Sequence, residues 1–248
     1  MTPESPFFAE ALAGLKRSPL FGGLDEATLT TMLGRCRRET WGHKRQLPLE
    51  ESWERFHILL SGRVRLCRSN PDNGRMITLF LHGPGDGFCL FSLLDGQPHE
   101  VILETLDDVT LLSVPMAEAR QWLVDYPDFN RTLLPYIGQQ MAALANLAAD
   151  LALHDTEARL ARLILRHVDD SQAEQVEPRL INDLSNESLA EMIGSVRVVV
   201  NRQLQHWKQA GIVDAHRGHL KVEKLQALAE RADRHLMRVR RPATLTLQ

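Results

Sequence analysis

Residues 184–213 read LSNESLAEMIGSVRVVVNRQLQHWKQAGIV, and this stretch predicts two short helices joined by a tight turn. Ser185 is a suitable N-cap for the first helix, whose apolar residues recur at helical spacing. Gly194 can end this helix because glycine accepts a positive φ at no steric cost, and Ser195 can cap the helix that follows. This is the pattern of a helix-turn-helix, a motif that places its second helix in the major groove of DNA.

The second helix carries the side chains that we expect to meet the DNA. Its outward side is predicted to hold Arg197, Val198, Asn201 and Arg202. An arginine near the start of such a helix can bind guanine with two hydrogen bonds, so Arg197 is predicted to contact a base. Phosphate contacts are expected from Ser185, Ser195, Asn201, Arg217 and Lys221. The alternative is an ordinary surface helical hairpin with two solvated arginines.

The C-terminal part of the chain adds a wing and a positive charge. Residues 212–213 and 220–222 predict two short strands joined by a polar turn at 214–218, with a helix over 223–235. Residues 183–241 contain 11 Lys and Arg against 7 Asp and Glu, a net charge of +4, whereas the whole chain is at −3. A basic end on an acidic protein favours a polyanion, such as DNA, as the partner of that end.

The composition is that of a globular protein. The chain has 248 residues, of which 44% are hydrophobic and 25% charged, and this suits two modest domains. No apolar run is long enough to span a bilayer, and the N-terminus lacks the features of a signal peptide, so we expect a cytoplasmic protein with no membrane partner. Cys36, Cys67 and Cys89 form no CxxC pair, which argues against a disulfide framework and a structural zinc site.

The first half of the chain predicts helices followed by a β-roll. Residues 5–38 follow a helical pattern that is interrupted near Ser18. After residue 39 the pattern changes to short alternating segments separated by turn residues, as in a jelly roll or barrel. The predicted strands are residues 56–60, 63–67, 77–81, 101–104 and 109–114, and a helical pattern returns at Met116.

A long helix of about 28 residues is expected to start at Pro127. Apolar residues recur along it in steps of 3, 4, 3, 4 and 3, at Leu134, Ile137, Met141, Leu144, Ala148 and Leu151. Such a seam can pack against its own copy in a parallel homodimer. It can also pack on the roll of the same chain, and one face can do both.

These elements predict an α+β fold with three regions. Residues 1–126 form N-terminal helices and a β-roll or jelly-roll sensor domain. Residues 127–168 form the dimerisation helix and the helix that follows it. Residues 169–248 form a winged helix-turn-helix that binds DNA.

This order of domains resembles the family of the cyclic AMP receptor protein and FNR, the CRP/FNR family. The resemblance covers residues 14–230 and is most specific in LSGRVRL at 60–66, GPGDGFCLFSLLDGQP at 83–98 and LAEMIGSVRVVVNRQL at 189–204. It implies a homodimeric transcription regulator that binds palindromic double-stranded DNA and contacts RNA polymerase. It also implies that an effector in the cyclic-nucleotide-binding-like roll re-orients the DNA-binding domains. By this resemblance, Arg197 and Arg202 match the base-reading and phosphate-reading arginines of the recognition helix.

Two parts of the chain depart from the family's pattern. Val198 stands where many members carry a Glu that reads cytosine, so we expect a different DNA half-site. In the roll, the ribose-binding Glu and the phosphate-binding Arg-Ser pair are replaced by Leu90, His99 and Glu100. A carboxylate at the phosphate position repels the ligand, which argues against cyclic AMP and cyclic GMP. An FNR-type iron–sulfur cluster needs four cysteines, and the chain has three.

Cys89 and Phe91 complete the predicted effector pocket of Leu90, His99 and Glu100. Cys89 aligns with the cysteine that ligates haem in the CooA branch of the family, so haem is a candidate cofactor with Cys89 as its ligand. The match does not continue, because Phe91 stands where CooA has an alternative histidine ligand. Other candidate ligands are His82, His99 and His154. The other interpretation is that Cys89 is a small buried core residue.

The function predicted from the sequence is a DNA-binding transcription regulator, not an enzyme, whose roll responds to a non-nucleotide signal such as a haem-bound gas or a redox change. One alternative is a cupin-like metal enzyme with an accessory helical domain, which needs two or three His and a carboxylate. His57, His82 and His99 stand apart without an HxH pair, and the sequence contains no GxSxG, P-loop or HExxH motif. Another alternative is a regulator with no small-molecule effector.

Overall fold

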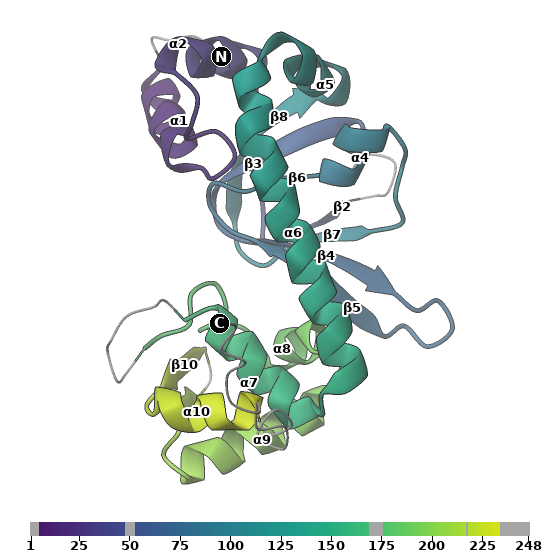
Figure 1. The fold of residues 1–248 in the computed structure, drawn as a ribbon, viewed down its shortest axis with the longest axis vertical. Coiled ribbons are helices and arrows are strands. Elements are labelled where there is room, and N and C mark those ends of the chain that lie inside the picture. Colours follow the sequence, from purple (N-terminus) through teal and green to yellow (C-terminus); the bar gives the residue numbers. More distant parts are fainter. Residues whose placement is uncertain (1–4, 48–52, 169–175, 217, 234–248) are drawn as a thin grey trace, which may run out of the picture. The chain divides into compact units, whose positions relative to one another are not determined.

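The computed structural model describes residues 5–47, 53–168, 176–216 and 218–233. The chain divides into two compact units, Met1–Ala145 and Asn146–Gln248, and each is described here by itself. Helix α6 (Pro127–Leu153) begins in the first unit and ends in the second (Figure 1). The predicted α+β class is confirmed: a β-rich domain and a long helix precede a C-terminal helix-turn-helix.

Two helices open the described chain, α1 (Pro6–Arg17) and α2 (Glu26–Arg35). Asp25 caps α2, because its carboxylate accepts hydrogen bonds from the Thr28 backbone N–H at 2.9 Å and the Thr28 hydroxyl at 2.7 Å. The prediction of helix as far as residue 38 was wrong, since Cys36 has an extended backbone and a strand begins at Arg37. That strand is polar for most of its length, and pairing with a distant strand, rather than local pattern, fixes its conformation.

Two four-stranded antiparallel sheets make the roll (Figure 1). The first has the order β1-β8-β3-β6, with β1 (Arg37–Trp41), β8 (Val109–Pro115), β3 (Arg55–Ser61) and β6 (Gly87–Phe88). The second has the order β2-β7-β4-β5, with β2 (Gln46–Leu47), β7 (Ile102–Thr105), β4 (Val64–Ser69) and β5 (Met76–His82). The predicted strands correspond to β3, β4, β5, β7 and β8, and the sequence analysis missed β1, β2 and β6.

The interior of the roll is filled by aliphatic and aromatic side chains from both sheets. Phe56, Leu59, Val64 and Leu111 have no accessible surface. The turn between β3 and β4 depends on Gly62, which has φ +81° and closely approaches the start of β8. A Cβ atom at this position would lie 2.6 Å from a Val109 methyl carbon, so any other residue would clash as well as strain the backbone.

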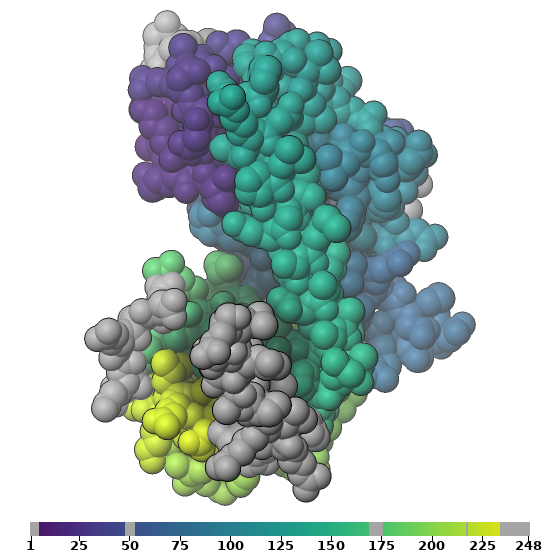
Figure 2. All heavy atoms as spheres, viewed as in Figure 1, coloured from purple at the N-terminus to yellow at the C-terminus, as the bar shows by residue number. Residues whose placement is uncertain are grey.

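Three helices complete the first unit: α4 (Leu90–Asp95), α5 (Met116–Asp125) and the first part of α6. Helix α6 buries Phe129, Leu133 and Tyr136, and the Tyr136 hydroxyl donates to Asp86 Oδ1 at 3.1 Å. The outer face of this part of α6 lies open at the surface (Figure 2). Among the described residues, no helix, including the 27-residue α6, combines the length and apolarity needed to cross a membrane.

The second unit packs four helices and a hairpin after the end of α6. Its elements are α7 (Thr156–Arg166), α8 (Asn186–Met192), α9 (Arg197–Gln209), β9 (Val213–His216), β10 (His219–Val222) and α10 (Leu225–Ala232). Helix α7 is joined to the end of α6 by the buried Asp150, which accepts from Arg162 and Arg166 at 2.6 Å each. The Trp207 indole N–H of α9 donates to Glu157 Oε1 of α7 at 3.1 Å, which fixes α9 against α7.

Candidate nucleic-acid interface and the cavity of the roll

Helices α8 and α9 form the predicted helix-turn-helix. Ser185 is the N-cap of α8, and its hydroxyl accepts from the Ser188 backbone N–H at 3.1 Å, as predicted. Gly194 adopts φ 61° in the turn. The prediction that Ser195 caps the second helix was wrong, because α9 begins at Arg197 and its N-cap is Val196, which offers no side-chain oxygen. The first backbone N–H groups of α9 therefore lack a side-chain cap, and the positive end of the helix dipole is left for an outside group.

Helix α9 has one buried face and one open face. Val200, Leu204 and Trp207 are buried against the rest of the unit. Arg197, Asn201 and Arg202 are exposed, and Val198 is 76% exposed. The open face therefore combines two arginines and an amide with one exposed apolar side chain.

A groove of about 720 Å³ runs between α8, α9 and the β9–β10 hairpin, and we call it the wing groove. Among the predicted DNA contacts, Ser185, Arg197 and Asn201 line this groove together. Asn186 Nδ2 donates to Asn201 Oδ1 at 3.1 Å, which holds the Asn201 amide in place. The groove lining does not include Ser195, Val198, Arg202 or Lys221. Some of the predicted DNA contacts thus line the wing groove, and the others lie outside it.

The predicted wing is present as β9 and β10, with His216 and His219 as direct cross-strand partners. The strands extend further toward the turn than predicted, since β9 continues to His216. Lys221 is half-buried and pairs with Glu223 at 3.2 Å, so the charge it offers to a phosphate is partly compensated. Arg217, the other predicted wing contact, lies outside the described residues.

The roll contains a small apolar cavity of about 50 Å³. Its lining comes from β4, β5, β6, α4 and α6, and consists of Leu66, Phe80, His82, Phe88, Cys89, Leu90, Phe91, Leu94, Ile137, Gln140, Met141 and Leu144. Three predicted pocket residues, Cys89, Leu90 and Phe91, therefore share this cavity. His99 instead lines a smaller hollow beside Phe91 and bonds Asp95 at 2.9 Å. Glu100 is 85% exposed, at 3.3 Å from Arg68.

Cys89 and His57 form a buried pair beside this cavity. The Cys89 Sγ and His57 Nδ1 atoms are 3.9 Å apart, and the His57 ring stacks on Phe88 with centroids 5.0 Å apart. Burial lowers the pKa of His57 to about 3 and raises the pKa of Cys89 to about 12. Both groups are therefore neutral near pH 7, and Cys89 is held as a thiol rather than as the thiolate that binds metals.

The lining of this cavity does not match a cyclic-nucleotide site, and its cysteine is not in the form that ligates haem. The described lining holds no Lys or Arg to receive a phosphate, and the Cys89 thiol is buried in its neutral form. The cavity is therefore suited to an apolar molecule rather than to an anionic one.

The predicted seam of α6 is divided between two environments. Ile137 and Leu144 are half-buried and pack against the core of the roll. Leu134 and Met141 are each 66% exposed. Ala148 and Leu151, in the second unit, are also exposed. We call Ile137 and Leu144 the inner half of the seam, because they pack within the chain. The outer half, which includes Leu134 and Met141, presents apolar surface to solvent.

Two known domain families match the chain. A cyclic nucleotide-binding domain matches residues 50–126, and a Crp-like helix-turn-helix domain matches residues 158–231. The chain belongs to the CRP/FNR family of transcription regulators. The first match falls on the roll and the second on α7 to α10, so the family's two domains occur here in the predicted order.

Relatives of this CRP/FNR protein include established regulators. The CRP-like cAMP-activated global transcriptional regulator of Mycobacterium tuberculosis is 26% identical over 228 residues, or 91% of this chain and 98% of the relative. The global nitrogen regulator of Synechocystis sp. is 28% identical over 180 residues, or 71% of this chain and 80% of the relative. A CooA variant from Carboxydothermus hydrogenoformans has a TM-score of 0.67 at 23% identity, covers 81% of this chain and 89% of its own, and shows the fold.

Family membership also bears on the enzyme alternative. The relatives are transcription regulators rather than enzymes. His57 and His82 are buried among aromatic rings, and His99 lies apart at the surface. Within the described part of the chain, the grouping of side chains suited to a metal ion is found on the wing, not in the roll. The structure therefore does not support a cupin-like metal centre in this family member.

Sequence reasoning missed several residues of these sites. Phe80 and Gln140 line the cavity but lie outside the quoted motifs, and Phe88, inside the motif at 83–98, was not assigned to the pocket. Asp214 and His216 were assigned to the turn at 214–218, and His219 fell between that turn and the predicted strand at 220–222, which concealed their placement on one face of a hairpin. The alternation D-A-H in 214–216 was the available signal, because alternate residues of a strand share a face.

Proposed function

We propose that this CRP/FNR protein is a homodimer that binds palindromic double-stranded DNA in a sequence-specific way through α9. The observation that carries this proposal is the division of α9 into a buried apolar face and an exposed face with Arg197, Asn201 and Arg202. A helix buried on one side only, with arginines on the other, has the form that enters a major groove. Regulators of this family act by contacting RNA polymerase, and we propose the same role for this protein. We also propose that it acts in the cytoplasm.

The proposed DNA contacts follow from position along α9. Arg197 is the first residue of the helix, where side chains reach base edges, and its guanidinium can bind guanine with two hydrogen bonds. Val198 can offer only an apolar contact, for which a thymine methyl group is the natural partner. Arg202 and Asn201 lie further along the open face, and Ser185 at the start of α8, all suited to phosphates. The uncapped N–H groups of α9 add a further attraction for a phosphate.

Selection of bound sequences from a random pool of duplex DNA tests this function. We expect inverted repeats whose half-sites are separated by about one helical turn, as for a two-fold symmetric dimer. The half-site should contain a guanine for Arg197. A pool that is bound without enrichment, or enrichment of single half-sites only, would contradict the proposal. Binding that depends strongly on salt but shows no sequence preference would mean that the protein binds DNA non-specifically, through the phosphates alone.

Dimerisation is assigned to the outer half of the α6 seam. Leu134 and Met141 are largely exposed in the single chain, and a seam in steps of 3 and 4 can pack against a second copy. Leu134→Asp would place a carboxylate in that interface, and we expect sedimentation to show monomer at micromolar concentration. Val124→Asp is the matched control, because Val124 is also an exposed apolar residue but lies on α5, away from the seam. A monomeric wild type, or equal effects of both substitutions, would contradict this assignment.

We infer that the effector of the roll is not a cyclic nucleotide. The cavity lining is almost wholly apolar, and Glu100 is paired with Arg68 at the surface instead of facing a ligand phosphate. Ile137, Met141 and Leu144 belong both to the cavity and to the seam, so a molecule that enters the cavity presses directly on the dimerisation helix. Calorimetry with cyclic AMP should show no saturable binding, and a micromolar dissociation constant would overturn this inference.

A further inference from the structure

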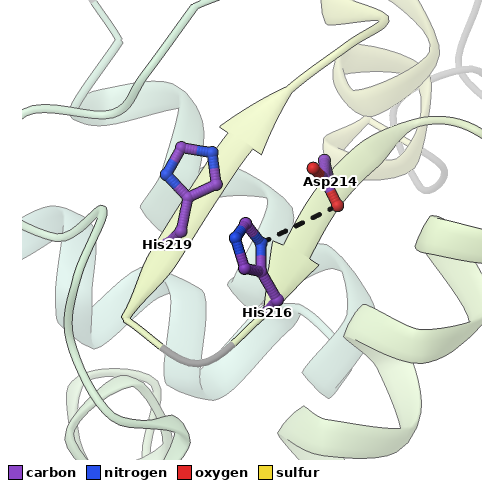
Figure 3. A group of neighbouring side chains, drawn as sticks. All are labelled: Asp214, His216 and His219. Carbon is purple, nitrogen blue, oxygen red and sulfur yellow. Dashed lines mark ion pairs between the residues drawn. The ribbon is translucent and has the colours of Figure 1, made fainter.

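Three side chains capable of binding a metal share one face of the wing. His216 of β9 and His219 of β10 are direct cross-strand partners, and Asp214 lies two residues before His216 on the same strand. Cross-strand partners and alternate residues of a strand lie on the same face of a hairpin. Figure 3 shows the two imidazole rings side by side, with the Asp214 carboxylate next to His216.

The potential ligand atoms are already close together. Asp214 Oδ1 lies 3.9 Å from His216 Nδ1, and the rings of His216 and His219 have centroids 4.7 Å apart. One ligand atom from each of the three residues lies within 4.8 Å of the others. Around a tetrahedral ion with bonds of about 2.0–2.1 Å, ligand atoms are roughly 3.3 Å apart. His216 and Asp214 are about half exposed, so side-chain rotations that draw the atoms together meet little resistance.

The ligand types select a class of metal. Two imidazoles and one carboxylate are typical ligands of Zn²⁺, and they also bind Co²⁺, Ni²⁺ and Cu²⁺. Ca²⁺ and Mg²⁺ prefer sites made of oxygen ligands and are therefore disfavoured. Three protein ligands leave at least one coordination position open to water or to another group.

One neighbouring cation opposes metal binding and provides a means of testing it. The Lys208 ammonium lies 3.1 Å from Asp214 Oδ1 and also donates to the Ala215 carbonyl at 3.2 Å. A metal ion must share the Asp214 carboxylate with this ammonium or displace it. Removing the Lys208 charge should therefore strengthen metal binding, whereas an unrelated surface site would not respond.

We propose that Asp214, His216 and His219 form a binding site for one divalent transition-metal ion of the Zn²⁺ class on the wing. The site borders the wing groove, since His216 and His219 both line it together with Arg197 and Asn201. It lies in the C-terminal unit and uses none of the residues of the roll cavity. The metal would bridge β9 and β10 on either side of their turn, and so would tie the hairpin together.

Titration of the full-length protein with Co²⁺, followed by its visible absorption, and with Zn²⁺, followed by calorimetry, tests the site without DNA. We expect one equivalent per chain at micromolar concentration. His216→Ala and His219→Ala should each weaken binding by about tenfold or more, because even the loss of a group that only orients a ligand costs about 10–100-fold in metal affinity. Asp214→Asn should also weaken binding, and Lys208→Gln should strengthen it. Far-ultraviolet circular dichroism should show that each variant keeps its fold.

His43→Ala is the matched control, because His43 is an exposed histidine in the other unit whose backbone N–H, not its ring, bonds Asp108. Its Zn²⁺ affinity should equal that of the wild type. No saturation at one equivalent, or wild-type affinity in both His216→Ala and His219→Ala, would overturn the proposal. Because DNA is absent from these titrations, failure here leaves the proposed DNA-binding function intact.

Discussion

The roll and the wing place their histidines in opposite environments. His57 and His82 in the roll are buried and stack on aromatic rings. His216 and His219 in the wing lie at the surface, with their ring nitrogens near a carboxylate. Burial favours the neutral imidazole, for His82 even with Asp86 Oδ2 at 4.0 Å, so these rings act as aromatic packing groups, whereas an exposed imidazole can bind a proton or a metal ion. Burial, rather than residue type, therefore decides which histidines are available for chemistry.

The same contrast applies to the groups beside these histidines. Cys89 has its pKa raised to about 12 by burial, so the residue with the strongest sequence resemblance to a metal ligand is held in an unreactive form. Asp214 has its pKa lowered, chiefly by its hydrogen bond to Lys208, and remains a carboxylate at the surface. The cysteine that resembles a haem ligand is thus held as a thiol in the roll, whereas the carboxylate of Asp214 on the wing is ionised and exposed to solvent.

Acid should destabilise the roll through His57. Burial lowers its folded-state pKa to about 3, so below the unfolded-state pKa of about 6.5 the unfolded chain binds the extra proton. The contribution of neutral His57 to the unfolding free energy is therefore fully present above pH 6.5 and is lost as the pH falls toward 3. The loss from His57 between pH 7.5 and pH 5 is about 2 kcal/mol. Urea denaturation at the two pH values measures the change in unfolding free energy, and His57→Phe should reduce this change by about 2 kcal/mol.

His216→Phe is the control for this acid effect, since it replaces an exposed histidine by the same residue. It should leave the pH dependence of the unfolding free energy as in the wild type. If His57→Phe and His216→Phe behave alike, the contrast between the buried and exposed histidines has no energetic consequence. His82, whose pKa is also lowered by burial, should add to the acid effect in both variants.

Zinc should strengthen DNA binding modestly if both the metal site and the DNA interface are as proposed. The ion would add positive charge to the wing face that also carries Lys221. Because this charge would neutralise DNA phosphate, about one more counterion would be released from the DNA on binding. The expected gain is on the order of 1 kcal/mol at low salt and less at high salt. Fluorescence anisotropy with and without Zn²⁺ measures it. A gain that persists in His219→Ala would show that zinc acts elsewhere.

The parts of the fold with a long or regular pattern could be predicted from the sequence. Ser185 and Gly194 bracket the first helix of the motif, and α6 begins at Pro127 and ends within a residue or two of the predicted length. Strands β5 and β7 alternate between buried and half-buried residues, whereas β3, β4 and β8 are each short apolar segments buried over four consecutive residues. In these segments most local preferences agree with the final structure, although α6 continues through Pro135, which is a poor helix former.

Other elements depend on contacts that the sequence does not display. Strands β2 and β6 have two residues each and are held only by pairing with β7 and β3. Helix α4 has six residues and starts after Cys89 in a left-handed conformation, which is uncommon for a non-glycine residue. The cavity is closed by Phe80 and Leu144, which are far apart in the chain. The roles of Glu100 and Arg68 could not be predicted because their pairing spans two different segments.

The most direct test of sequence-specific binding through α9 is a DNA titration of Arg197→Ala and Lys221→Ala at two salt concentrations, combined with selection from a random pool. Arg197→Ala should lose about 1–3 kcal/mol per half-site and relax the preference at one base pair. Lys221→Ala should weaken binding to all sequences alike and lower the salt slope by about 1 or less, because Glu223 already compensates part of its charge. If Arg197→Ala leaves both affinity and selected sequence unchanged while Lys221→Ala alters the sequence selected, α9 does not read the DNA as proposed.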